Sequence, residues 1–168
     1  TVKNYLRVVE NLTADLRLYG NTISNEKWNQ LGLSEIAEYR GWLDYSKDVS
    51  TLKDIDVFLQ LLDDNNVSKA GWPNKLGDYL AFGKPVILSP YGDIIDFVKN
   101  EKGFFIVEYN KYSILKILQE IKDIPYSVLK TMGYANRQLA EKISWKNRAK
   151  NIEYICNKIR FNNETVKN

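Results

Sequence analysis

Residues 71–90 read Gly-Trp-Pro-Asn-Lys-Leu-Gly-Asp-Tyr-Leu-Ala-Phe-Gly-Lys-Pro-Val-Ile-Leu-Ser-Pro, and this stretch decides the fold. Pro73 suits the first turn of a helix, where its missing N–H group is not needed. Apolar residues then recur at helical spacing up to Gly83, which predicts a helix that ends there. The apolar run Val86-Ile87-Leu88 is typical of a buried parallel strand. A loop, a helix and a buried strand in this order form half of a doubly wound α/β unit.

Polar residues on this predicted helix form a candidate binding site. Asn74 and Asp78 share a face of the helix, and Lys75 lies beside them. The loop Gly71-Trp72 leads into the helix N-terminus, whose free N–H groups and dipole attract phosphate. Together these groups could hold a sugar nucleotide, with Lys75 and the amides at the diphosphate and Asp78 at the ribose hydroxyls. A solvated helix face with ordinary capping is the alternative interpretation.

The run from Pro73 to Ile87 resembles the signature of group 1 (family 4) retaining glycosyltransferases, within their C-terminal, nucleotide-sugar-binding domain. Those enzymes usually carry Lys-Leu-x-Glu-Tyr-x-Ala-x-Gly-Lys-Pro-Val, whose Glu is the second of a pair and binds the donor ribose. Asp78 occupies that position here, and Ala70 stands where the first Glu of the pair would fall. The resemblance therefore implies nucleotide contacts, with a departure from the family at the donor sugar.

Strand and helix alternate along the whole sequence, which predicts a Rossmann-like, doubly wound parallel sheet with helices on both faces. We expect a single sheet in which the apolar runs 56–62 and 85–89 are adjacent at the centre. The other expected strands are 15–19, 36–40 and 103–107. The expected helices are 2–12, 25–33, 48–55, 73–83, 93–99, 112–121, 128–142 and 145–159, and residues 63–68 are expected to form a polar loop.

Three predicted loops follow strand ends, where open parallel sheets bind their ligands. They are Gly41-Trp42-Leu43, residues 63–72 and residues 90–92. The resemblance implies that the first loop meets the base through backbone groups, and that the second loop and its helix hold phosphate and sugar. For Trp42 a core or interface position is the alternative, and for Trp72 a covering role at the helix start.

Composition limits the classes of function. The chain has 168 residues, enough for one domain with a sizeable core, and its formal net charge of +3 is too small to indicate nucleic-acid binding. The absence of His and the single Cys156 exclude a zinc site and a His-based acid–base pair, and suit a reducing cytosol. No stretch is long and apolar enough to span a bilayer. The chain opens on Thr1 in what reads as mid-helix, so we expect an N-terminally truncated fragment.

The resemblance implies one donor-nucleotide-binding domain over residues 1–168, with closing helices at about 125–160, from the C-terminal half of a GT-B glycosyltransferase. The full-length enzyme would be a hexosyltransferase that moves a sugar from a UDP- or GDP-linked donor to a glycan, lipid or other acceptor. It would need no metal or other cofactor, because Lys75 and helix amides neutralise the diphosphate. The acceptor would bind an N-terminal domain outside this sequence, and the fragment alone would be inactive.

Two other classes are weighed against this interpretation. A non-catalytic module that binds a nucleotide sugar or a protein on the same fold fits the departure at Ala70. A signalling receiver domain fits less well, because no predicted strand ends in a lone Asp with the acidic and Lys partners such domains need. For the full-length protein we expect a cytoplasmic location and peripheral contact with the inner face of the membrane. No residue is assigned a catalytic role.

Overall fold

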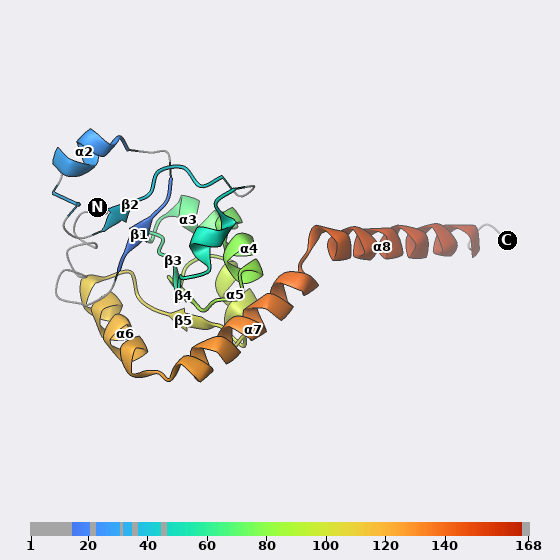
Figure 1. Ribbon diagram of the computed structural model, residues 1–168. Coiled ribbons are helices and arrows are strands. Elements are labelled where there is room, and N and C mark those ends of the chain that lie inside the picture. Colours follow the sequence, from blue (N-terminus) through green and yellow to red (C-terminus); the bar gives the residue numbers. More distant parts are fainter. Residues whose placement is uncertain (1–14, 21–22, 31, 35–36, 45–46, 166–168) are drawn as a thin grey trace.

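The computed structural model describes residues 15–20, 23–30, 32–34, 37–44 and 47–165. The helix predicted over residues 2–12 lies outside this part of the chain. The described elements form an α/β body, from which the last helix extends (Figure 1).

The strands of the body pair in parallel. β1 (Arg17–Leu18) pairs with β2 (Glu38–Tyr39). β3 (Phe58–Gln60), β4 (Val86–Leu88) and β5 (Phe104–Ile106) form a second ladder in the order β3-β4-β5. The predicted α/β class with parallel strands and flanking helices is therefore confirmed.

The prediction of one sheet with both apolar runs at its centre is partly wrong. The runs 56–62 and 85–89 are adjacent, and β4 is the middle strand of its ladder. However, β3 is an edge strand of that ladder, and β1 and β2 form a separate two-stranded sheet. An apolar run indicates that both faces of a strand are buried. It does not indicate whether that strand lies at the centre or at the edge of the sheet.

The helices confirm most of the predicted order. They are α2 (Asn25–Gln30), the 3₁₀ helix η2 (Val49–Leu52), α3 (Asn66–Ala70), α4 (Asn74–Ala81), α5 (Ile94–Val98), α6 (Lys111–Asp123), α7 (Tyr126–Lys142) and α8 (Trp145–Thr165). The loop predicted over residues 63–68 is wrong, because α3 begins inside it. The Asn65 side chain caps α3 by accepting a hydrogen bond from Ser68 N at 2.8 Å. A polar segment can thus contain the first residues of a helix, because Asn is among the residues most favoured at the N-cap.

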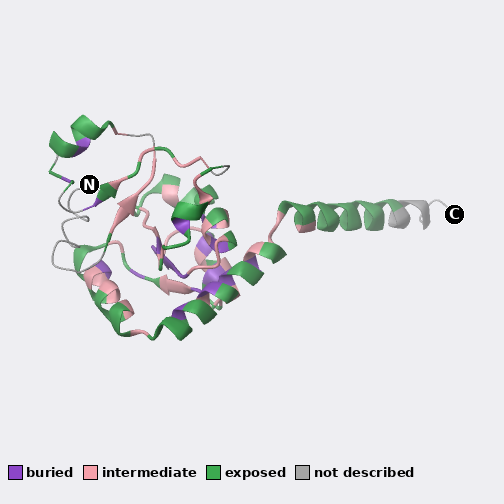
Figure 2. Ribbon diagram, viewed as in Figure 1, coloured by how far each residue is buried: buried purple, intermediate pink, exposed green. Residues whose placement is uncertain are grey.

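The core lies on both faces of β4, whose three residues are fully buried (Figure 2). Val86 and Leu88 point to one face and pack with Leu76 and Leu80 of α4. Ile87 points to the other face and belongs to the cluster that α6 covers. The alternation of side chains along a strand therefore places α4 and α6 on opposite sides of the sheet.

α7 is fixed to the amino ends of β4 and β5. Gly133 packs directly on Gly83, so that an added Cβ would overlap the Gly83 carbonyl oxygen. Asn136 is fully buried, and its Nδ2 donates to the carbonyl oxygens of Lys84 and Gly103, each at 2.9 Å. These contacts lie at the end of the sheet opposite to the carboxyl ends of the strands.

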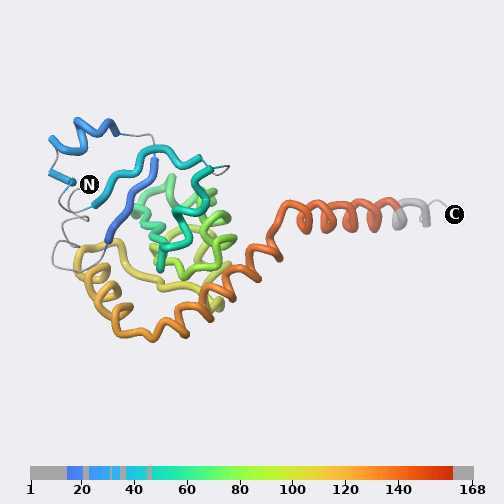
Figure 3. Tube along the Cα trace, viewed as in Figure 1, coloured from blue at the N-terminus to red at the C-terminus, as the bar shows by residue number. Residues whose placement is uncertain are grey.

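α8 extends away from the body (Figure 3). Residues 150–160 are all exposed, including Ile152, Tyr154 and Ile155 at 54–67%. Its first turn contacts the body, where the Arg148 guanidinium lies 5.8 Å from the Trp72 ring centroid. None of the described helices is long and apolar enough to cross a bilayer.

Deletion of residues 150–168 should therefore change the melting temperature of the body by less than about 2 °C. Changes at exposed positions usually alter stability by about 0.5 kcal/mol or less. Thermal unfolding of the truncated and intact chains measures this. Deletion of residues 145–168, which also removes the contact between Arg148 and Trp72, is the control. It should lower the melting temperature more than the shorter deletion does. A loss of about 5 °C or more for the shorter deletion would contradict the exposed position of α8.

Candidate functional site

A cavity of about 970 Å³ lies between β1 and β3. Its lining includes residues 15–20, which contain β1, and residues 54–61, which contain β3, together with side chains of α4 and α6. On one side of the cavity the strand order, counted outward, is β1 and then β2. On the other side it is β3, β4 and then β5. The cavity thus coincides with the point where the strand order reverses, the place where doubly wound folds bind their ligands.

One end of this cavity, here called the carboxyl end, is formed by segments that follow the strands. Gly20 follows β1, Trp42 and Leu43 follow β2, Lys75 lies in the first turn of α4, and Tyr109 follows β5. All five residues line the cavity. The fold thus brings together residues that lie as far apart in the sequence as positions 20 and 109.

Three of the predicted site residues meet at this end: Trp42, Leu43 and Lys75. Trp42 is 71% exposed, so the alternative of a core position is wrong for this residue. An exposed indole ring and an exposed lysine that line the same cavity offer a stacking surface and a positive charge to one ligand.

Gly41 and Trp72 are not among the residues that line the cavity. Gly41 has φ +67°, and its carbonyl oxygen accepts a hydrogen bond from Gly20 N at 2.7 Å, so it shapes the turn after β2. Trp72 stacks edge-on against Phe97 of α5 with ring centroids 5.3 Å apart, and Arg148 lies over its ring. The covering role, given above as the alternative for Trp72, agrees with these contacts.

The first turn of α4 is exposed. Pro73 occupies the N-cap, one residue earlier than a first helical position, and makes no side-chain capping bond. The first N–H groups of a helix have no partner within the helix, and those of Asn74 and Lys75 belong to this first turn. Both side chains are exposed, and Gly71 lies exposed just before them. This helix end faces the carboxyl ends of the strands.

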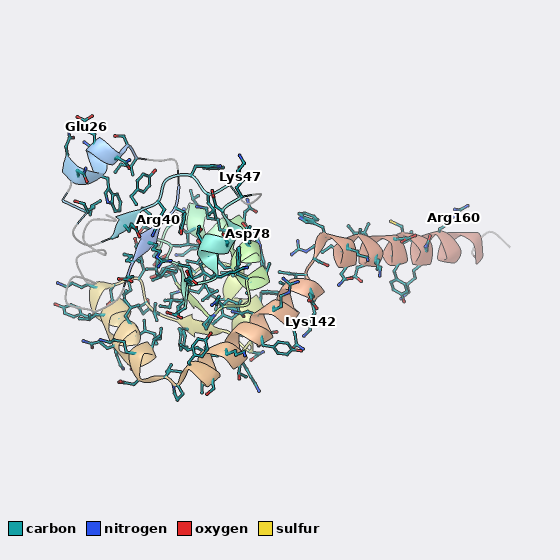
Figure 4. All side chains as sticks on the ribbon, in the orientation of Figure 1. Glu26, Arg40, Lys47, Asp78, Lys142 and Arg160 are labelled. Atoms are coloured by element: carbon teal, nitrogen blue, oxygen red, sulfur yellow. The ribbon has the colours of Figure 1, made fainter. Side chains whose placement is uncertain are left out.

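Asp78 lies one turn further along α4, on the exposed surface of the body (Figure 4). It does not line the cavity, but the next residue, Tyr79, does. Burial raises the pKa of Tyr79, and the negative charge of Asp78 raises it further. The Tyr79 ring stacks on Phe58 at 4.4 Å, which fixes this part of α4 against β3. The assignment of Asp78 to a ribose stays a prediction.

The loop after β4 packs tightly against its neighbours. Ser89 is fully buried, and its Oγ accepts a hydrogen bond from Leu62 N at 2.9 Å. Gly92 has φ +80°, and an added Cβ would lie 2.8 Å from the Lys69 carbonyl oxygen of α3. Lys69 itself forms an ion pair with Asp64. Within the described ranges, no group of three or more His, Cys, Asp or Glu side chains lies close enough to hold a metal ion.

No protein-family model matches this sequence, and no curated protein matches it. Solved structures do match the fold. A sucrose-phosphate synthase from Thermosynechococcus elongatus aligns over 94% of this chain with a TM-score of 0.72 and 15% identity. A glycosyltransferase from Rickettsia africae aligns over 89% with a TM-score of 0.68 and 17% identity. Anabaena HepE, solved in complex with UDP and glucose, aligns over 82% with a TM-score of 0.61 and 13% identity.

The chain shares the α/β fold of one part of these glycosyltransferase structures.

The chain spans only part of these glycosyltransferase structures: 42% of the synthase, 42% of the Rickettsia protein and 39% of HepE. At these identities the likeness concerns the fold alone. Anabaena HepE was also solved with UDP-glucose, so one structure of this fold holds a nucleotide sugar.

Several residues that line the cavity are not among the predicted site residues. Gly20 follows the strand expected over residues 15–19, and Tyr79 lies within the helix expected over residues 73–83. Both line the cavity, as do Tyr109 and the cation Arg17. A glycine placed directly after a strand at a reversal of strand order is a signal that could have identified Gly20. No local pattern distinguishes Tyr109 from an ordinary strand-end aromatic residue.

Proposed function

We propose that residues 1–168 are the C-terminal, donor-nucleotide-binding domain of a group 1 retaining glycosyltransferase, a hexosyltransferase that uses a UDP- or GDP-linked sugar. The observation that carries the proposal is the position of the signature helix α4. Its first turn, with Lys75, lies at the carboxyl end of the cavity where the strand order reverses. An exposed lysine in an exposed first helical turn at that place suits the diphosphate of a donor.

The donor would bind with its diphosphate at the first turn of α4. Lys75 supplies a full positive charge there, and the free N–H groups supply the partial positive charge of the helix end. The base would lie at Gly41, Trp42 and Leu43, where an exposed indole ring offers a stacking surface. Asp78 would accept hydrogen bonds from the ribose hydroxyls.

Acceptor binding belongs, in this proposal, to polypeptide outside residues 1–168. The support is that matching glycosyltransferase structures are more than twice as long as this chain. Glycosyl transfer needs groups and water exclusion from both sides of the donor, so the fragment alone should be inactive. A cytoplasmic location, with peripheral contact at the inner face of the membrane, stays a prediction for the full-length protein.

A non-catalytic nucleotide-sugar-binding module is the second candidate, and Ala70 favours it. Ala70 stands where the family has the Glu that contacts the donor sugar, and it ends α3 as an exposed residue. Both candidates bind the nucleotide in the same place. Turnover by the full-length protein separates them, because only the enzyme releases the nucleoside diphosphate in the presence of an acceptor.

A melting scan with UDP-, GDP- and ADP-glucose tests nucleotide binding by the chain. We expect a UDP- or GDP-sugar at about one hundred times its Kd to stabilise the fold by about 2.7 kcal/mol, a shift of roughly 5–10 °C. Lys75→Met should weaken binding about tenfold or more, since it removes the cation at the diphosphate. Lys130→Met, an exposed lysine on α7, is the matched control and should bind normally. Absence of a shift with every nucleotide sugar would refute the proposal.

A further inference from the structure

The chain changes direction between α7 and α8, and hydrogen bonds fix the first turn of α8 on the end of α7 (Figure 1). Asn147 Nδ2 donates to the carbonyl oxygen of Glu141 at 2.7 Å, and Asn147 N donates to Ser144 Oγ at 3.4 Å. These bonds lie within residues 141–147. They attach α8 to α7 and do not reach the rest of the body.

Arg148 supplies a second attachment, to the loop before α4. Its guanidinium carbon lies 5.8 Å from the ring centroid of Trp72 and 5.6 Å from that of Trp145, the first residue of α8. A guanidinium within about 6 Å of an aromatic ring centroid is attracted by the negative face of the ring. The cation thus links the start of α8 to a loop that is distant in the sequence.

Trp72 is itself held against the body on its other side. Its ring meets Phe97 of α5 edge-on, with ring centroids 5.3 Å apart, and only 39% of Trp72 stays exposed. The next residue, Pro73, is the N-cap of α4, and its carbonyl oxygen accepts a hydrogen bond from Leu76 N at 2.9 Å. A shift of the Trp72 ring therefore moves the residue from which α4 begins.

The length of α8 amplifies a small movement at this joint. Residues 150–160 are all exposed, so the contacts of the first turn set the direction of the helix. A helix rises about 1.5 Å per residue, so a rotation of about 30° at Arg148 displaces Cys156 by roughly 6 Å.

We propose that Arg148 is a positioning residue: held between Trp72 and Trp145, it couples the direction of α8 to the first turn of α4. Such a coupling is reciprocal, so a change in either element alters the other. The coupling itself needs no ligand. Its consequence for a donor, that Arg148 helps to place Lys75, rests on the proposed function.

Two variants of Arg148 and one control test the proposal. Arg148→Met keeps a long side chain and removes the cation, whereas Arg148→Lys keeps the charge and loses the planar group that stacks on aromatic rings. Lys150→Met, at an exposed position of the same helix, is the matched control for the loss of one positive charge. We expect the direction of α8 to be lost in Arg148→Met, partly kept in Arg148→Lys and unchanged in the control.

Spin labels measure the direction of α8. Cys156 is the only cysteine of the chain and is exposed, and Lys130→Cys provides a second exposed label position on α7. Double electron–electron resonance should give a narrow distance distribution for the labelled parent and for Lys150→Met. The distribution of Arg148→Met should be about twofold broader or more, because the second attachment is lost.

Hydrogen exchange without any ligand reports the state of α4. The amide of Leu76 should exchange about threefold or more faster in Arg148→Met than in the control, because the start of the helix loses a restraint. The amide of Phe82, which donates to Asp78 O at the other end of α4, is the internal reference and should not change. The affinity for UDP-glucose should fall about three- to tenfold in Arg148→Met only.

Each contrary result has a distinct meaning. Equal distance distributions in all of the chains would show that Arg148 does not hold α8 and would overturn the inference. A broader distribution with unchanged exchange at Leu76 would refute the coupling to α4. Faster exchange at Leu76 and Phe82 alike would indicate a general loss of stability and would also contradict it. Absence of UDP-glucose binding by the parent would refute the proposed function, and the two ligand-free measurements would still decide the coupling.

Discussion

Replacement of Gly133 by alanine should lower the free energy of unfolding by about 2–3 kcal/mol, the range expected when a side chain is forced into a filled contact. Gly133 lies in the middle of α7 and packs on the turn after α4. An added Cβ would overlap the Gly83 carbonyl oxygen and lie 3.2 Å from Lys84 Cα, and both atoms belong to the backbone. α7 would have to move away from the sheet, and the two hydrogen bonds of buried Asn136 would lengthen with it.

The sign of the change in the free energy of unfolding shows whether close packing or helix propensity dominates at Gly133. In an exposed helix interior, Gly→Ala stabilises by about 1 kcal/mol, because alanine loses less backbone entropy. Gly77 in α4 provides the matched control, since an added Cβ there meets nothing within 4 Å. Urea denaturation should therefore show Gly77→Ala as slightly more stable and Gly133→Ala as clearly less stable than the parent. A gain in stability for both variants would show that α7 does not pack closely on this turn.

Asp78→Asn should weaken the binding of a UDP- or GDP-sugar by about tenfold to a hundredfold. A charge-assisted hydrogen bond contributes about 1.5–3 kcal/mol, and the amide keeps only one acceptor and no charge. Asp78→Glu introduces the residue that is usual in the glycosyltransferase signature which residues 73–87 resemble, and this variant should bind about as well as the parent or better. The effect of both changes on folding should be small, because Asp78 is exposed on α4.

Calorimetric titration of the sugar nucleotide into the parent and the two Asp78 variants measures these affinities. Asp96→Asn on α5 controls for the loss of one exposed negative charge, and it should leave the affinity unchanged. The alternative interpretation, a helix face without a ligand, predicts a melting shift for the Asn variant and no change in affinity. Equal affinities in all of these proteins would remove Asp78 from the site.

The sequence alone determined the local elements and the fold class. Periodicity is a local property, so the apolar spacing before Gly83 and the run Val86-Ile87-Leu88 were enough to place α4 and β4. The helices expected over residues 128–142 and 145–159 are present as α7 and α8, but α8 extends away from the body and does not close the domain. The parallel arrangement of the strands followed from the alternation of strand and helix, because a parallel neighbour needs a crossover.

Only the tertiary structure decided which segments are neighbours. Lys75 and Trp42 line one cavity although 33 positions separate them. The sequence pattern placed both residues at the same edge of the sheet, but it did not show that they share a cavity. The close contact of Gly133 with Gly83 and the separation of β1 from β3 are equally invisible in the sequence. The spacing of apolar residues indicates which face of a helix or strand is buried. What covers that face depends on the packing of the whole chain, because burial is non-directional and any apolar neighbour satisfies it.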